Sequence, residues 1–141
     1  MGFAASFAPV FVQVALTFTL LFLAGRARLA AIQRGDVDLR DIALREPNWP
    51  AQPTQLINAY HNQLELPVLF YLFVMVAFFS AHMTFTLGLL SWLFVATRLL
   101  HALVHGTTNE LRRRFVLFAS GVAILAFMWL LLAIDVFVIG A

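Results

Sequence analysis

Asn58, Asn62 and Glu65 form the first group of side chains that could do chemistry in this chain. They lie in the segment NAYHNQLELPVLFY (58–71), spaced by four and three residues. On a helix, such spacings put all three side chains on one face. A carboxylate at the mouth of an apolar run is costly to bury. We therefore expect Glu65 either to be held by a partner or to hold a ligand.

Arg98, His101 and His105 form the second group, and their spacing of three and four residues also places them on one helix face. If the two helices run antiparallel, Glu65 and Arg98 lie at similar depths, about 12–15 Å from the same end. We therefore predict a direct Glu65–Arg98 ion pair. Two interpretations stay open: a pair that only fixes helix register, or a polar pocket for a small, hydrophilic, anionic ligand.

A metal site is a further alternative for the same residues. His101 and His105 are four residues apart, and Glu65 or His61 could complete a ligand set. Membrane di-iron hydroxylases use such pairs but need many more histidines than the four of this chain, and His82 is expected at the opposite end of its span. We therefore predict hydrogen-bonding histidines and no metal.

The elements that must position these groups are membrane-spanning helices. The chain has 141 residues, of which 62% are hydrophobic and 11% charged, too apolar for a soluble domain. Four apolar stretches are near the ~20 residues that cross a bilayer as a helix, and none alternates as a β-barrel strand would. They cover roughly residues 8–25, 56–80, 84–105 and 113–139. The predicted fold class is an all-α membrane protein, a single-domain up-and-down bundle of four transmembrane helices.

The basic residues predict the orientation of this bundle. All nine are arginines, in or near the polar connection 26–55 or the link between the third and fourth spans: Arg26, Arg28, Arg34, Arg40, Arg45, Arg98, Arg112, Arg113 and Arg114. The positive-inside rule then puts both connections in the cytoplasm and both termini outside, and we expect the plasma membrane. A net charge of +2 in so apolar a chain gives no nucleic-acid signature. With no cysteine, the protein has no thiolate of its own.

Pro67 and Asp135 carry two smaller predictions. Pro67 follows Glu65 by two residues, and a proline inside a helix removes one backbone hydrogen bond, so a kink beside the polar stripe is expected. Asp135, near the end of the fourth span, is expected to reach the outer surface or to meet a neighbouring helix.

At these residues the chain resembles the MAPEG family, the membrane-associated proteins in eicosanoid and glutathione metabolism. One family motif is Asn-x-x-Glu near the start of the second helix, followed by Pro and Phe, which here reads Asn62-Gln-Leu-Glu65, then Pro67 and Phe70. Another is an Arg in the third helix with hydrogen-bonding aromatics three and seven residues on, then an Arg near the start of the fourth helix. Here the corresponding positions hold Arg98, His101, His105 and Arg112. The resemblance covers essentially the whole chain and implies homotrimers that bind glutathione between subunits near the cytosolic side.

The resemblance also implies which residues would act. Arg112, with His105 assisting, would lower the pKa of the glutathione thiol, and the thiolate would attack a lipophilic electrophile or peroxide arriving through the bilayer. Glutathione itself would be bound by Asn58, Asn62, Glu65, Arg98, His101 and either Arg26 or Arg28. The chain departs from the family in three places. Asn58 stands where glutathione-using members commonly have Arg, His101 and His105 replace two tyrosines, and Pro67 comes one residue early.

Two functions follow as hypotheses. The first is a glutathione-dependent transferase or peroxidase that acts on lipophilic electrophiles. The second is a non-catalytic trimeric scaffold or partner subunit of the same fold with a degenerate pocket. Asn58 and the two histidines are the sequence features that separate them.

Overall fold

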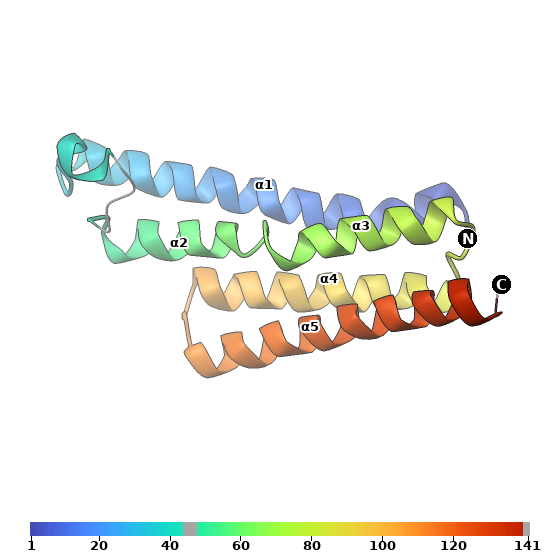
Figure 1. Cartoon of the computed structure of the whole chain (residues 1–141). Helices are drawn as coiled ribbons and strands as arrows, with labels where there is room; N and C mark the ends of the chain where they lie inside the picture. Colours follow the sequence, from blue (N-terminus) through green and yellow to red (C-terminus); the bar gives the residue numbers. More distant parts are fainter. Residues whose placement is uncertain (44–47, 140–141) are drawn as a thin grey trace.

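A computed structural model describes residues 1–43 and 48–139, and every regular element in these residues is a helix (Figure 1). Arg45, one of the predicted cytoplasmic arginines, lies outside the described residues. The elements in chain order are α1 (Phe3–Gln33), a short 3₁₀ turn (Leu39–Ile42), α2 (Ala51–His61), α3 (Leu66–Phe79), α4 (Phe85–Gly106), α5 (Leu111–Ile134) and a final π-helical turn (Asp135–Ile139).

The helices form the predicted up-and-down bundle. α1 packs against α2, α3 and α4, while α5 packs against α4 and α3. Both chain ends lie at the end of the bundle that carries the α3–α4 turn, and the other two connections lie at the opposite end (Figure 1). Four segments are long and apolar enough to cross a membrane: Phe3–Gln33, Ala51–Phe79, Phe85–Gly106 and Leu111–Ile139. The four-helix all-α membrane fold is therefore confirmed.

The connection predicted over 26–55 is shorter in the structure. α1 continues through Gln33 and carries Arg26 and Arg28, while α2 already begins at Ala51 and includes Pro53. A proline in the first turn of a helix costs little, because the backbone N–H there has no partner within the helix. Pro53 is therefore compatible with the first turn of α2.

The second span is broken where the sequence predicts one helix with a kink. α2 ends at His61, residues 62–65 form a turn, and α3 begins at Leu66 with Pro67 in its first turn. In an unbroken helix the ring of Pro67 would clash with the carbonyl of Gln63. The break therefore falls directly before the proline, between Asn62 and Glu65.

The core of the bundle is a layer of large apolar side chains from α3, α4 and α5. Phe70 and Phe94 are fully buried and stack with ring centroids 4.7 Å apart, and Met128 packs beside them. On the outside the helices expose further large apolar side chains, among them Phe22, Leu72, Phe85, Phe127 and Leu130. Such wide apolar surfaces fit a bilayer and would be a liability in water.

Candidate functional site

A small polar pocket opens between the α2–α3 turn, α4 and α5, in the half of the bundle near the arginine-rich connections. Its cavity is about 230 Å³. The lining residues are Asn62, Glu65, His101, Leu111, Arg114, Phe115 and Phe118. Three of the predicted site residues thus line one cavity, and they come from two different spans.

Asn62 and His105 are joined across the α2–α4 interface. Asn62 Nδ2 lies 3.0 Å from His105 Nδ1, and because an amide nitrogen only donates, the ring nitrogen accepts. His105 is 2% exposed and stands beside His101, with ring centroids 5.6 Å apart. The structure therefore brings Asn62, His101 and His105 together, as their spacing predicts.

Arg98 is the largest fully buried side chain of the described residues. Its guanidinium lies between the rings of Phe94 and Phe118, 5.8 and 5.3 Å from their centroids. Arg98 Nη2 donates to the Leu117 carbonyl over 3.3 Å. Nε and Nη1 have no hydrogen-bond partner among the described residues. Arg98 thus offers donors that nothing in the described parts of the chain satisfies.

The predicted Glu65–Arg98 ion pair is wrong. The ion pairs found within residues 1–43 and 48–139 include neither residue, and Glu65 is exposed at the pocket. The physical reason is the break at residues 62–65, since helical spacing no longer relates Glu65 to Asn58 and Asn62 once the helix stops at His61. Arg98 instead makes its hydrogen bond to α5, at the Leu117 carbonyl.

Gly121 on α5 is what admits the Arg98 guanidinium. A Cβ at this position would lie 2.9 Å from Arg98 Nη2 and 3.0 Å from Thr97 Oγ1. Both distances are shorter than van der Waals contact, so any larger residue would displace Arg98. The glycine therefore fixes where the cation lies beneath the pocket.

His101 lines the cavity, and Arg98 does not. His101 is 3% exposed, and its Nδ1 has no hydrogen-bond partner in the part of the chain that the structure describes. Within that part, no three histidine, cysteine, aspartate or glutamate side chains cluster closely enough to hold a metal ion. Of the two histidines, His101 lines the polar cavity, and His105 is hydrogen-bonded to Asn62, which also lines it.

Arg114 lines the pocket, and Arg112 does not. Arg114 Nη1 donates to Asn109 Oδ1, and its Nε has no partner among the described residues. Arg112 lies with Glu110 and Arg113 at a separate depression of about 510 Å³. Sequence reasoning missed Arg114. The signal lies in the spacing of the buried side of α5, because steps of three and four residues back from Gly121 reach residues 118 and 114. The buried residues of α5 are Gly121, Leu125, Met128 and Leu132.

The remaining predicted site residues lie away from this pocket in the single chain. Asn58 is exposed and is not among the lining residues. On α1, the Arg26 guanidinium lies 5.7 Å from the centroid of the Phe22 ring. Arg28 lies closer to its aromatic partner, 4.6 Å from the centroid of the Trp49 ring. None of the three lines the polar cavity within one subunit.

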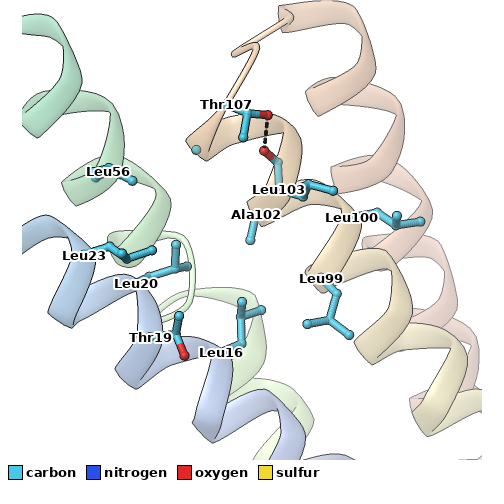
Figure 2. A pocket seen from close by; sticks show the side chains of 11 residues that line it. Leu16, Thr19, Leu20, Leu23, Leu56, Leu99, Leu100, Ala102, Leu103 and Thr107 are labelled. Carbon is cyan, nitrogen blue, oxygen red and sulfur yellow. Dashed lines mark hydrogen bonds between the residues drawn. The ribbon is translucent and has the colours of Figure 1, made fainter.

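An apolar groove of about 420 Å³ lies on another side of α4, between α1, α2 and α4 (Figure 2). Leucines from the three helices line it, including Leu20, Leu56 and Leu103. The hydroxyl of Thr107 at its edge is bonded to the carbonyl of Leu103, so it offers little polarity to the groove (Figure 2). Leu99, Leu100 and Leu103 point to a different face of α4 from Arg98, His101 and His105, so groove and polar pocket are separate.

Comparison with known proteins agrees with the motifs that flank the pocket. The family model of the MAPEG family matches residues 6–134 of the chain, from the first turns of α1 to the last residue of α5. No curated protein and no solved structure matches the chain. The matched range includes every residue of the polar pocket and all four apolar segments except their outermost turns. This protein is a member of the MAPEG family.

Proposed function

We propose that this protein is a glutathione-dependent transferase or peroxidase that acts on lipophilic electrophiles within the bilayer. The observation that carries the proposal is the polar pocket, where one carboxylate and several donors are left without partners among the described residues. Membership of the MAPEG family supports the choice of ligand class. The single-chain geometry supports Asn62, Glu65 and His101 as binding residues.

The charges at the pocket match a ligand that carries both signs. Glu65 lies in the middle of the apolar Ala51–Phe79 segment, where an uncompensated carboxylate costs about 2.5–3.5 kcal/mol. A ligand ammonium would offset that cost. Arg114 Nε is a donor suited to a carboxylate, and His101 Nδ1 is a second one in the tautomer that carries its proton there. Glutathione has one ammonium, two carboxylates and a thiol, which fits this set.

The size of the pocket supports the proposal of a homotrimer. At about 230 Å³, the cavity is smaller than the roughly 300–1,000 Å³ typical of small-molecule sites. A second subunit would add the missing wall. Arg112, Asn58 and Arg26 lie outside this pocket, so in a trimer we assign them to the wall that a neighbouring subunit supplies.

The proposed chemistry needs a stabilised thiolate and an electrophile from the lipid side. Arg112 is assigned to the thiolate, because a nearby guanidinium lowers the pKa of a thiol. His105, held by Asn62 at 3.0 Å, is assigned to assist it. In the transferase reaction a sulfur–carbon bond forms as the leaving group departs. In the peroxidase reaction the O–O bond breaks while two glutathione molecules are oxidised to the disulfide.

Titration of the purified protein in nanodiscs with glutathione tests the proposal. Wild type is expected to release heat and to develop thiolate absorbance near 240 nm, whereas Arg112→Ala is expected to bind glutathione without that absorbance. No heat at millimolar glutathione would refute the proposal. Binding with the same absorbance in wild type and Arg112→Ala would remove Arg112 from the chemistry and favour the non-catalytic scaffold.

The proposed orientation places the termini outside the plasma membrane and the 34–50 and 107–110 connections in the cytoplasm. Because the chain has no cysteine, single cysteines can report on it directly. With a membrane-impermeant maleimide on intact cells, Gly2→Cys is expected to react and Asp36→Cys to stay protected until the cells are lysed. Labelling of Asp36→Cys but not of Gly2→Cys on intact cells would place the termini in the cytoplasm and contradict the proposed orientation.

A further inference from the structure

Two buried glutamines tie the break between α2 and α3 to α1, and the proposed chemistry uses neither. Gln13 lies on α1 and Gln63 in the turn, and both side chains are 0% exposed. Gln13 Nε2 donates to Gln63 Oε1 over 2.9 Å. Gln63 Nε2 donates to the carbonyl of Ala59 over 3.0 Å. Gln63 therefore uses one end of its amide toward α1 and the other toward its own helix.

The side chain of Gln63 replaces a backbone bond that the break removes. In a continuous helix the N–H of Gln63 would bond to the carbonyl of Ala59. Here that N–H bonds to the Tyr60 carbonyl over 2.9 Å, which tightens the turn and leaves the Ala59 carbonyl to the side-chain amide. A carbonyl at membrane depth needs a partner. Gln63 thus stabilises the end of α2 in its broken form.

The bond to α1 fixes the direction in which the turn faces. Pro67 explains why the helix is interrupted, but a proline sets no contact with α1. Gln13 makes its one side-chain bond to Gln63, and its Oε1 has no partner among the described residues. This contact therefore determines how the turn is rotated against α1.

Asn62 and Glu65 lie on either side of Gln63 in this turn, and both line the polar pocket. Glu65 has φ −101° and ψ −97°, outside helical geometry, so no helical register fixes its direction. We propose that Gln13 and Gln63 are positioning residues whose hydrogen bond directs Asn62 and Glu65 at the ligand. This inference rests on the proposed glutathione site.

Gln13→Met tests the inference, because methionine has a similar length and removes only the amide. In nanodiscs we expect glutathione to bind about five- to tenfold more weakly. Without glutathione, we expect faster amide hydrogen exchange in the 62–66 turn. Ser91→Ala is the matched control, since Ser91 is also 0% exposed and its hydroxyl bonds only to Leu87 within α4. The control should change neither glutathione affinity nor exchange in the turn.

Wild-type glutathione affinity and unchanged exchange in Gln13→Met would overturn the inference, as would an equal loss of affinity in Ser91→Ala. If Gln13→Met does not fold, Gln13→Asn keeps the amide but shortens its reach, and the same two shifts are expected. If wild type itself binds no glutathione, the proposed function fails separately. Exchange in the turn then still decides whether the glutamine pair holds it.

Discussion

Two acids of the bundle, Asp135 near the chain termini and Glu65 at the polar pocket, differ in whether the chain supplies a partner. At the end with the chain termini, His82 Nδ1 lies 2.8 Å from Asp135 Oδ2, and the N-terminal ammonium reaches the Met83 carbonyl at 3.5 Å. Asp135, expected either to reach the surface or to meet a neighbour, meets the α3–α4 turn. At the polar pocket, Glu65 makes no ion pair within the described residues, while the acids of the arginine-rich connections, Asp36 and Glu110, pair with Arg34 and Arg113.

This difference distinguishes polar groups that stabilise the fold from polar groups that can bind a ligand. Charges in apolar surroundings are expensive. Asp135 has a partner in His82, whereas Glu65 has no ion-pair partner among the described residues. The polar pocket leaves an acid exposed beside nitrogens of Arg114 and His101 that have no partner among the described residues. The His82–Asp135 pair therefore contributes to stability, and the polar pocket is where we expect binding.

Replacing Glu65 and Asp135 in turn should give the largest difference in glutathione affinity. We expect Glu65→Gln to weaken glutathione binding about 30- to 100-fold, because the ligand ammonium loses its only carboxylate partner at the pocket. Thermal stability should be unchanged or higher, since the variant removes an unpaired charge from an apolar region. Isothermal titration and thermal unfolding in nanodiscs measure the two effects.

Asp135→Asn is the matched control for this contrast, and glutathione should bind it as it binds wild type. Equal loss of affinity in Glu65→Gln and Asp135→Asn would show that the two acids do not differ in the way proposed.

Adding one methyl group at Gly121 and at Gly88 should give the next largest difference, in the free energy of unfolding. At Gly121, a Cβ would lie 2.9 Å from Arg98 Nη2, so Gly121→Ala is expected to destabilise the protein by about 1–3 kcal/mol. At Gly88, a Cβ would meet the end of the Met1 side chain, which can move aside, so Gly88→Ala should change stability by less than about 0.5 kcal/mol. Thermal unfolding of both variants measures the difference, and equal losses would contradict it.

The fold was predictable because it depends on segment length and charge alone. Four apolar runs and the clustered arginines predict the spans and place two connections at one end, and the structure has that topology. The Asn62–His105 contact follows the same logic, since Asn62 caps the end of α2 with helical backbone angles and His105 lies on α4, which packs against α2.

The wrong prediction, the Glu65–Arg98 ion pair, concerns a residue where the regular helix stops. Glu65 follows a break whose geometry depends on Gln13, a residue on a different helix and 50 positions away, so local spacing placed it wrongly against Arg98. The spacing of the family motif points to Arg112, and this assignment stays a prediction, while Arg114 went unnoticed. Which arginine lines the pocket of the single chain depends on how α5 is rotated about its axis. The buried residues of α5, which include Gly121, show that rotation.

Breaking the ion pair at the terminal end should have a smaller effect. Removing either His82 or Asp135 by His82→Gln or Asp135→Asn is expected to cost about 1 kcal/mol, because both side chains are partly exposed. The two substitutions should be non-additive, since each removes the same contact. A double-mutant cycle by thermal unfolding measures this, and full additivity would show that the contact does not stabilise the bundle.

The two arginines near the end of α1, Arg26 and Arg28, differ in their aromatic contacts. Arg28 is half-buried and its guanidinium stands 4.6 Å from the Trp49 ring centroid, a contact worth about 0.5–1 kcal/mol. Arg26 is exposed, and its guanidinium is 5.7 Å from the Phe22 ring centroid. Arg28 thus has a structural partner in the 34–50 connection, which leaves Arg26 the better candidate for a neighbouring subunit's pocket.

Arg28→Gln is therefore expected to speed proteolytic cleavage within the 34–50 connection about two- to fivefold and to leave glutathione affinity unchanged. Arg26→Gln is expected to do the reverse, weakening glutathione about threefold at low salt because an exposed guanidinium gives a small, screened attraction. Limited proteolysis and titration at two salt concentrations measure both. If Arg28→Gln lowers glutathione affinity and Arg26→Gln does not, Arg28 is the ligand-facing residue and its stacking on Trp49 must open when glutathione binds.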